Sequence, residues 1–307
     1  MLYKNICIII LMILFSCSDN GLGCLNFDCT GECGGDAILD ECGVCNGDNT
    51  LCFGSSEGLD IITWNIQNFP KNNNTIDSLS SMMNTLAVDI FSLQEIESTQ
   101  SLNILNLELG ENWESYRSNS NSSSGELSYL INTDEIEIIQ APYAILQQYS
   151  HEFASREPYV LEFTHNDSNY ILINIHYKCC DGSEERRMQA SIYLEDYIST
   201  NFSNERLILL GDFNDLLIDT YNVFDPFLSD PTNYEFGDYY IAEDPSALWS
   251  FPSWPSHIDH ILVTNELFEV YDVKTIAIDQ LFFNSLTDYD NLISDHRPLI
   301  IQISITP

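Results

Sequence analysis

The sequence Leu207-Ile208-Leu209-Leu210-Gly211-Asp212-Phe213-Asn214 is an apolar run that ends in a glycine and two polar side chains. A short apolar run with such an end predicts a buried β-strand. We expect Gly211 to permit a tight exit from the strand. Asp212 and Asn214 are two residues apart and should therefore point the same way. A simple Asx-turn is the alternative interpretation of the Asp-Phe-Asn segment.

Similar polar residues lie at the edges of five other strand-like runs. They are Trp64-Asn65, Gln94-Glu95, Asn174-Ile175-His176, His257-Ile258-Asp259-His260 and Ser294-Asp295-His296. Oxygen ligands and histidines that come from the ends of several strands are suited to metal-assisted attack on a phosphate. The combination predicts a metal-dependent phosphoester hydrolase.

Hydrophobic periodicity predicts a mixed α/β fold from about residue 58 onward. We expect strands over 59–65, 89–96, 158–164, 170–177, 206–211, 258–264 and 299–305, and helices over 77–87, 99–109 and 184–202. The segments 126–132 and 135–140 suggest a β-hairpin.

Glu95 and Asp295 are the candidate metal ligands, with Asn65 beside them. Mg²⁺ prefers octahedral oxygen coordination with few protein ligands, and Mn²⁺ could take its place. Taken alone, Glu95 would be an exposed loop carboxylate. Its occurrence together with the other clusters favours the metal site.

His296 is the candidate general base, and Asp259 is the carboxylate that would orient it and raise its basicity. His176 would donate a hydrogen bond to a phosphate oxygen or serve as the acid. Of Asp212 and Asn214, one would contact the attacking water or the metal, and the other would hold a phosphate oxygen. His257 and His260 are interpreted as rim or structural residues.

The formal net charge is −37, which disfavours long-range attraction to nucleic acid or to anionic membranes. Several of the few basic residues nevertheless lie at or near the polar clusters: Arg156, Lys178, Arg186, Arg187 and Arg297. A positive phosphate pocket could be built from them. For Arg186 and Arg187 the alternative is salt bridging on a helix face beside Glu184 and Glu185, which we favour for at least one of them.

Residues 1–17 have the pattern of a signal peptide, with Lys4 before the apolar run 6–15. The segment Leu14-Phe15-Ser16-Cys17 resembles the lipobox of bacterial lipoproteins, which predicts a lipid anchor on Cys17. An ordinary cleaved signal peptide is the alternative. No later stretch is long and apolar enough for a transmembrane helix, so the anchor would be the sole membrane contact. We therefore expect a tethered protein of the bacterial cell envelope, facing the periplasm or the outside.

Residues 18–57 are predicted to form a small disulfide-rich module. Six cysteines lie at positions 24, 29, 33, 42, 45 and 52, and such density after an export signal indicates disulfides. The module resembles Cys/Asp/Gly-rich spacer repeats of exported bacterial proteins, some of which bind Ca²⁺. A stapled stalk without metal is an equal alternative, and a zinc site is disfavoured because the segment lacks histidine.

From Leu59 onward the motifs together resemble the endonuclease/exonuclease/phosphatase superfamily. The resemblance covers residues 58–307 and implies a four-layer sandwich, in which two mixed β-sheets pack face to face between helices. It further implies Mg²⁺-dependent phosphoester hydrolysis. Asn65, Glu95 and Asp295 would then lie near the metal, and Asp212 and Asn214 at the phosphate. Asp259 and His296 would form the pair of carboxylate and general base.

Two features point to a branch of that superfamily. His176 in the Asn-Ile-His-Tyr-Lys segment resembles the deoxyribonuclease I, sphingomyelinase and phosphatase branches. Ser155-Arg156-Glu157-Pro158 resembles the deoxyribonuclease I branch, which implies that Arg156 contacts phosphate. Glu126 is assigned as the carboxylate partner of His176. The acidity of the chain argues against a DNA substrate.

Two further features have no assigned role. Ten aromatic residues between Tyr221 and Trp254 could stack on bases or enter lipid, although packing against the core accounts for most of them. The adjacent Cys179 and Cys180 could be a vicinal disulfide or free thiols.

The leading functional hypothesis is an exported nuclease or phosphodiesterase with nucleic acid or another phosphoester as its partner. A phosphomonoesterase or a sphingomyelinase-like phospholipase is the enzymatic alternative, and a non-catalytic surface-binding lipoprotein is the alternative of a different class. No obligate protein partner is inferred, and we expect a monomer.

Overall fold

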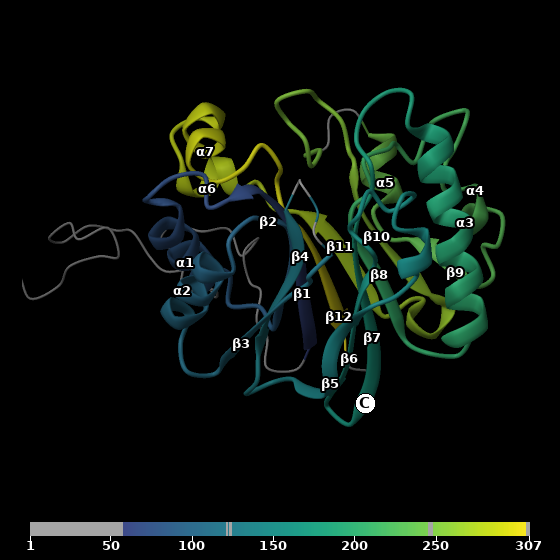
Figure 1. Cartoon of the computed structure of the whole chain (residues 1–307), viewed down its shortest axis with the longest axis horizontal. Coiled ribbons are helices and arrows are strands. Elements are labelled where there is room, and N and C mark those ends of the chain that lie inside the picture. The colour runs from purple at the N-terminus through teal and green to yellow at the C-terminus, as the bar shows by residue number, and fades with distance from the viewer. Residues whose placement is uncertain (1–57, 121, 123–124, 245–247, 305–307) are drawn as a thin grey trace, which may run out of the picture. The chain divides into compact units, whose positions relative to one another are not determined.

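The computed structural model describes residues 58–120, 122, 125–244 and 248–304 (Figure 1). The chain divides into two units, residues 1–52 and 53–307, and every described residue belongs to the second. The predicted signal peptide, the lipid-anchored Cys17 and the Cys-rich module of residues 18–57 lie outside the described residues.

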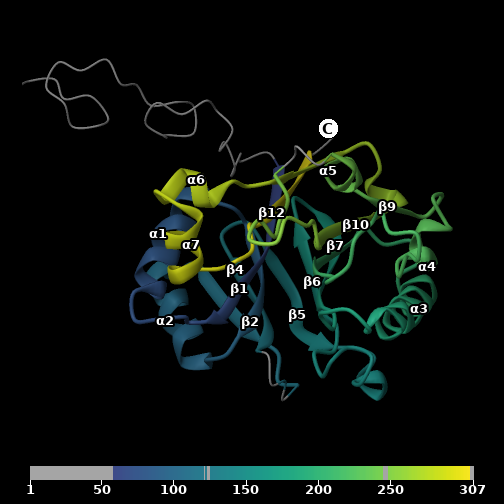
Figure 2. The same ribbon diagram turned by 90° about the horizontal axis from the view of Figure 1, so that it is seen from above.

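Two six-stranded mixed sheets form the centre of the described unit (Figures 1 and 2). The first has the order β11-β12-β1-β2-β4-β3, with β1 Gly58–Phe69, β2 Ile90–Ile96, β3 Trp113–Arg117, β4 Glu126–Asn132, β11 Tyr271–Thr275 and β12 Leu299–Ser304. The second has the order β5-β6-β7-β8-β10-β9, with β5 Glu137–Ala144, β6 Tyr159–His165, β7 Ser168–His176, β8 Leu207–Asp212, β9 Tyr234–Phe236 and β10 Asp259–Thr264.

Helices cover the outer faces of both sheets, which confirms the predicted four-layer sandwich (Figure 2). On the side of the first sheet lie α1 Thr75–Leu86, α2 Thr99–Leu109, α6 Ile278–Phe282 and α7 Leu286–Leu292. On the side of the second lie α3 Glu184–Asn201, α4 Asp225–Leu228 and α5 Tyr239–Glu243, and two 3₁₀ turns are η1 Gln147–Tyr149 and η2 Asn265–Leu267. Among the described helices, none is long and apolar enough to cross a membrane.

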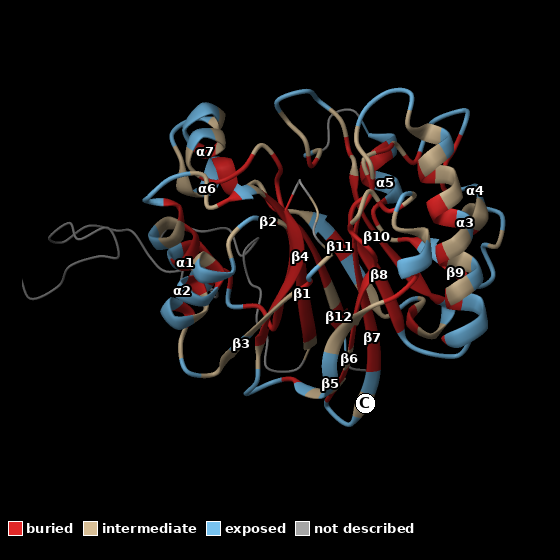
Figure 3. Cartoon of the chain, in the orientation of Figure 1, coloured by how far each residue is buried: buried red, intermediate tan, exposed pale blue. Residues whose placement is uncertain are grey.

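Strand alternation explains how this sequence fills two apolar layers. In β8, Leu207 and Leu209 face the layer beneath α3, whereas Ile208 and Leu210 face the layer between the sheets. Because successive side chains of a strand point to opposite faces, an uninterrupted apolar run is needed where both faces are covered. The buried strands at the centre of Figure 3 show the result.

The topology brings the polar strand ends to one edge. Strands β1 and β2 are parallel and joined through α1, and β7 and β8 are parallel and joined through α3. Strands β12 and β10 run antiparallel to β1 and β8, so that their first residues lie beside the last residues of their partners. Residues near the ends of four strands and the starts of two others therefore meet.

The predicted hairpin of residues 126–132 and 135–140 is wrong. Strand β4 pairs with β2 and β3, whereas β5 pairs with β6 in the other sheet. Ile136, in the connecting turn, is buried in the apolar layer between the two sheets. The side chain of Ile136 thereby holds the turn between the two sheets, and the chain continues from it into the second sheet.

Gly211 has a different role from the predicted exit turn. It lies inside β8 with φ of +142°, and a Cβ atom there would lie 2.0 Å from the carbonyl oxygen of Ile175 on β7. Only glycine tolerates both that conformation and that approach. The close pairing carries β8 one residue further, so that Asp212 is still part of the strand.

Candidate active site

The side-chain amide of Asn65, which lies in β1 just before the irregularity in its pairing with β2, links two carboxylates. Asn65 Nδ2 donates to Glu95 Oε1 at 3.1 Å and to Asp212 Oδ2 at 3.0 Å. Glu95 also accepts from the backbone N–H of Asn68 at 2.9 Å. Three predicted site residues from β1, β2 and β8 are thus brought into direct contact.

The candidate general base His296 and the carboxylate of Asp259 are in contact, as predicted. Asp259 begins β10 opposite Asp212, and its Oδ2 lies 2.7 Å from His296 Nδ1. The other ring nitrogen, Nε2, lies 3.9 Å from Asp212 Oδ2. Burial alone would lower the pKa of His296, but the charges of Asp259, Asp212 and Asp295 together raise it to about 10.

His176 has the opposite electrostatic setting. It is the last residue of β7 and is buried, with Nε2 3.3 Å from Asp212 Oδ2. Burial and the nearby positive charge of Arg156 hold the pKa of His176 well below its usual value. The two imidazoles therefore lie in opposite electrostatic environments, since the pKa of His296 is raised and that of His176 is lowered.

The assignment of Glu126 as the partner of His176 is wrong. Its carboxylate accepts from the hydroxyls of Ser118 and Ser120 and from the backbone N–H of Ser122. These bonds tie Glu126 to the serine-rich loop before β4, because that loop supplies unpaired donors next to the strand. Within the described residues, His176 Nδ1 is buried and has no hydrogen-bond partner.

Asp212 combines the two interpretations of its sequence motif. Its Oδ1 accepts from the backbone N–H of Asn214 at 3.0 Å, which is an Asx-turn contact, while Oδ2 faces Asn65 and the two histidines. Burial and the charge of Asp259 raise the pKa of Asp212 to about 7. Asn214 has a positive φ of 53° and donates its side-chain amide to the carbonyl of Tyr177.

The oxygen atoms at this edge of the sheets are suitable ligands for a hard divalent cation. Asp295 Oδ2 accepts from Gln67 Nε2 at 2.8 Å, whereas Asp295 Oδ1 is buried and has no hydrogen-bond partner within the described residues. A buried carboxylate oxygen without a donor is costly unless a cation takes it. Asp212, Asp259 and His296 also lie close enough to share an ion, but the hydrogen bond between Asp259 and His296 already uses those atoms. Asp295, with Glu95 and Asn65 from the neighbouring strands, is thus a residue that could hold a cation.

A cleft of about 760 Å³ opens over these residues. Its lining includes three basic side chains, Arg156, Lys178 and Arg186, beside Glu95, Asp212 and Asp295. Arg156 is held by its Nε and Nη2, which donate to the backbone carbonyls of His176 and Tyr177 at 3.0 and 2.8 Å. Basic side chains that could bind a phosphate thus lie in this cleft next to the carboxylates Glu95, Asp181, Asp212 and Asp295.

Two of the expected pocket bases have structural partners instead. Arg297 is buried and donates through Nε and Nη2 to both carboxylate oxygens of Asp279. Arg187 is buried and forms the expected kind of salt bridge, but its main partner is Asp215 at 2.7 Å, and Glu184 on the helix lies further away at 3.7 Å. Their guanidinium groups are fixed by carboxylates behind the cleft wall, since a buried charge needs a partner.

A second cleft of the same volume lies over the turns at the other end of the sheets. Its lining includes Glu114, Asp134, Glu135, Glu137 and Asp167, and no histidine, lysine or arginine among its described residues. Such a surface repels phosphate, so the cleft with the histidines is the candidate site.

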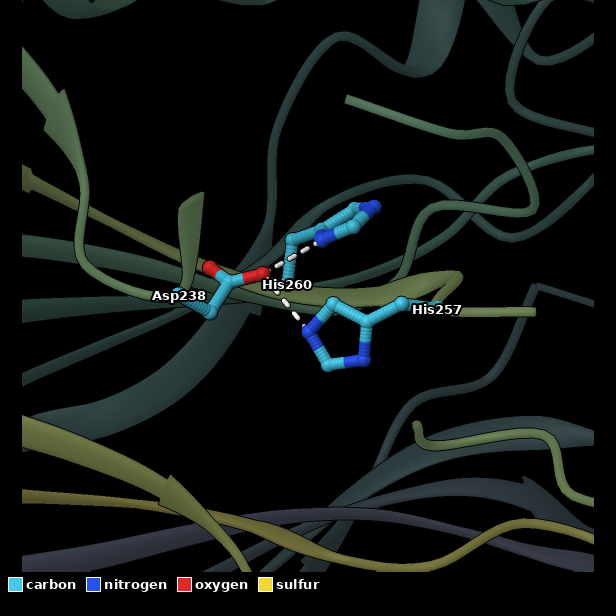
Figure 4. Close-up of side chains that lie close together, drawn as sticks. All are labelled: Asp238, His257 and His260. Atoms are coloured by element: carbon cyan, nitrogen blue, oxygen red, sulfur yellow. Dashed lines mark hydrogen bonds and ion pairs between the residues drawn. The ribbon is translucent and has the colours of Figure 1, made fainter. Parts of the chain in front are cut away.

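A buried network supports the strand that carries Asp259 (Figure 4). Asp238 Oδ2 contacts His257 Nε2 at 3.0 Å and His260 Nδ1 at 2.6 Å, and Asp238 Oδ1 accepts from the backbone N–H of Ile261. His260 Nε2 faces the carbonyl of Asp215 at 2.9 Å. Both nitrogens of His260 thus face acceptors only, which requires the imidazolium form. His257 and His260 are structural in this arrangement.

The model of the Endonuclease/Exonuclease/phosphatase family matches residues 62–296, which is most of the chain. This protein belongs to that family. Members hydrolyse phosphoester bonds. No protein among the curated sequences compared matches the chain.

Solved structures with the same fold include three relevant examples. Danio rerio TDP2, complexed with a single-strand DNA product, is 14% identical with a TM-score of 0.63, covering 82% of this chain and 100% of that chain. The human Nocturnin catalytic domain with bound sulfate is 16% identical with a TM-score of 0.59, over 81% and 95%. A mannosyl-6-phosphatase from Bacteroides thetaiotaomicron is 14% identical with a TM-score of 0.55, over 80% and 100%.

The structure also adds contacts to this family site that the sequence motifs did not indicate. Gln67 orients Asp295, and Ser294 links β1 to the loop before β12, because its Oγ donates to the carbonyl of Asn65 and accepts from the N–H of His296. Phe251 packs on the His296 ring at 4.9 Å. Each of these contacts joins residues far apart in the sequence, so only the folded geometry reveals them.

Proposed function

We propose that this protein is a divalent-cation-dependent phosphodiesterase that cleaves nucleic acid or other nucleotide diesters. The observation that carries the proposal is the Asp259–His296 pair, which faces Asp212 in a cleft lined by Arg156 and Lys178. An oriented imidazole, carboxylates that could hold a cation and basic side chains that could bind the phosphate are what in-line attack of water on a phosphodiester requires.

Each side chain then has a definite part. His296 Nε2 takes the proton of the attacking water, while Asp259 holds the proton on Nδ1 and stabilises the imidazolium. His176 donates from Nε2 to a phosphoryl oxygen. Arg156 uses Nε and Nη2 for its backbone contacts, so its Nη1 can bind another phosphoryl oxygen. Glu95 and Asp295, with Asn65, hold the cation. When bound, the cation supplies positive charge to the phosphoryl oxygens and offsets the carboxylate field around His296.

An exposed tryptophan favours a substrate that carries a nucleobase. Trp254 lines the cleft and is 78% exposed, whereas Phe224, Phe227 and Phe236 of the same aromatic-rich segment are buried in the core. An aromatic ring at the rim of a phosphate pocket offers a stacking surface that a sugar phosphate or a free phosphate would not need. This observation supports a substrate that carries a nucleobase over a simple sugar phosphate.

A substrate panel tests the proposal. With Mg²⁺ or Mn²⁺ present we expect hydrolysis of single-stranded DNA or RNA and of bis(p-nitrophenyl) phosphate, and loss of each activity with a chelator. Faster turnover of p-nitrophenyl phosphate or of sphingomyelin vesicles would instead support the monoesterase or phospholipase alternative. Inactivity on the whole panel, with no cation binding by calorimetry, would support a non-catalytic binding protein.

The stacking role is tested by Trp254→Ala. We expect the KM for an oligonucleotide to rise about fivefold or more, because stacking contributes about 1–3 kcal/mol per base, while the KM for methyl p-nitrophenyl phosphate changes little. Tyr221→Ala is the matched control, since Tyr221 is exposed in the same segment and pairs with Glu185 outside the cleft lining. Equal effects of both variants on the two substrates would refute the stacking role.

We also propose that the protein is anchored to the cell envelope through a lipid on Cys17, as the lipobox-like segment indicates. Metabolic labelling with a fatty acid should mark the full chain and fail to mark Cys17→Ala. Unlabelled wild-type protein released into the medium would instead indicate an ordinary signal peptide.

A further inference from the structure

Two adjacent thiols lie at the rim of the cleft, three residues after His176. Cys179 is partly buried, Cys180 is exposed, and both line the cleft beside Arg156 and Lys178. Their sulfur atoms are 2.7 Å apart, against about 2.05 Å in a disulfide. Bond formation would therefore require only a small movement.

The backbone is built to hold the two sulfur atoms together. Adjacent side chains of an extended chain point to opposite faces, but Cys180 has a φ of 79° and turns its side chain back toward Cys179. Arg187 Nη1 donates to the carbonyls of Lys178 at 2.8 Å and Cys180 at 3.2 Å, and Asp215 fixes Arg187 from behind. A strained turn that is clamped in this way at a substrate cleft indicates a functional constraint.

Lys178 distinguishes the two thiols. Its Nζ lies 3.3 Å from Cys179 Sγ. Burial alone would raise the pKa of Cys179, but the contacts with Cys180 and Lys178 and the charge of Arg156 lower it, whereas the pKa of Cys180 is raised. Cys179 is thus the more acidic thiol, and its sulfur lies beside one of the few cations of the cleft.

We propose that Cys179 and Cys180 form a thiol-modification site, which a low-molecular-weight disulfide oxidises to a vicinal disulfide. The Cys179 thiolate attacks the disulfide and displaces one thiolate, which leaves as a thiol after taking a proton from solvent. Deprotonated Cys180 then attacks Cys179 Sγ and displaces the second thiolate, which takes up the Cys180 proton. Two protein thiols and one small disulfide become one protein disulfide and two small thiols, so atoms and electrons balance.

The redox state of this site determines whether the Lys178 ammonium is paired with Cys179 or available to substrate. This part of the proposal rests on the proposed function. In the dithiol form the Lys178 ammonium pairs with the Cys179 sulfur. In the disulfide form that sulfur carries no charge, so the ammonium is free to bind a phosphate oxygen. We expect oxidation to lower the KM for an anionic phosphodiester roughly threefold to fivefold, the effect of one partly exposed ion pair.

Peptide mass tests the chemistry independently of activity. The reduced full-length protein is incubated with oxidised glutathione, quenched by alkylation and cleaved by trypsin. Cleavage after Lys178 and Arg186 isolates both thiols in the peptide of residues 179–186, away from every other cysteine. We expect a peptide about two mass units lighter than the dithiol, without alkyl or glutathione groups, whereas Cys180→Ser should retain glutathione on Cys179. Doubly alkylated or stably glutathionylated wild-type peptide would overturn the proposal.

The kinetic effect is measured on the same samples. Oxidation should lower the KM of the wild-type protein for bis(p-nitrophenyl) phosphate and leave that of the double variant Cys179→Ser/Cys180→Ser unchanged, which controls for the cysteines of the N-terminal segment. A disulfide that forms without a change in KM would overturn the link to Lys178. If the wild-type protein hydrolyses no phosphodiester, the proposed function fails, while the peptide mass still decides the thiol site.

Discussion

Replacing Asp238 by asparagine removes the charge at the centre of the buried network behind the active site. Asp238 accepts from three donors: the rings of His257 and His260 and the backbone N–H of Ile261. An asparagine amide has one acceptor and one donor end, so in either orientation its NH₂ group faces a buried donor. The imidazolium of His260 also loses its counter-charge.

Both effects lower stability. A buried donor left without an acceptor costs about 1–3 kcal/mol, and breaking a buried ion pair costs about 3–5 kcal/mol in all. We therefore expect Asp238→Asn to lower the free energy of unfolding by about 3–5 kcal/mol near pH 6. Asp272→Asn is the matched control, because Asp272 is about half exposed in its pair with Lys274 and should change the free energy by about 0–1 kcal/mol.

The difference should depend on pH with a definite sign. His257 and His260 lower the pKa of Asp238 despite its burial, so its stabilisation is present above its unfolded pKa and is lost as the pH falls. Asp238 raises the pKa of His260 despite its burial, so that stabilisation is present below about pH 6.5 and is lost as the pH rises through the folded value. The gap between wild-type and variant is thus largest between about pH 4 and 6.5.

Urea unfolding followed by circular dichroism at a series of pH values measures this gap. A gap of less than about 1 kcal/mol near pH 6, or one that does not narrow in acid and in alkali, would refute the ionised pair.

Three other predictions concern the carboxylates. Asp259→Asn should lower kcat by roughly 10²- to 10⁴-fold with little change in KM, because His296 loses the acceptor that sets its tautomer; steady-state kinetics with kcat within threefold of wild-type would contradict this. Asp295→Asn should raise the Mg²⁺ concentration for half-maximal activity roughly tenfold or more, and an unchanged Mg²⁺ titration would place the cation elsewhere. Asp89 has its pKa raised to about 7 by burial, so the folded state loses stability as the pH rises from about 4 to about 7 and carries the whole penalty above that range. Asp89→Asn, which keeps an acceptor for the N–H of Asp60, should therefore increase the free energy of unfolding by about 2–4 kcal/mol at pH 8 and little near pH 4; a variant no more stable at pH 8 would refute the shift.

The sequence predicted the central strands and long helices well because their signals are local. The helix at 99–109 has the predicted bounds, and the strands around Leu209 and Ile173 lie where their apolar runs indicated. Short edge strands such as β9 and β11 were missed, because three to five half-buried residues give too little periodicity.

The site was predicted as a set of strand ends and not as a set of contacts. Asn65, Glu95, Asp212, Asp259 and His296 converge because two parallel crossovers place their strands at one edge, which the spacing of motifs could suggest. The partner of Glu126 and the burial of Arg297 depend instead on which loop or helix covers each side chain. That choice is made by tertiary packing, which leaves no periodic trace in the sequence.

The central claim is that His296 acts in metal-dependent hydrolysis of a phosphodiester. The most direct measurement is kcat/KM for bis(p-nitrophenyl) phosphate with saturating Mg²⁺, for the wild-type protein and for His296→Ala. We predict activity that a chelator abolishes and a loss of roughly 10²- to 10⁴-fold in the variant. A variant within threefold of wild-type, or activity that survives the chelator, would contradict the account.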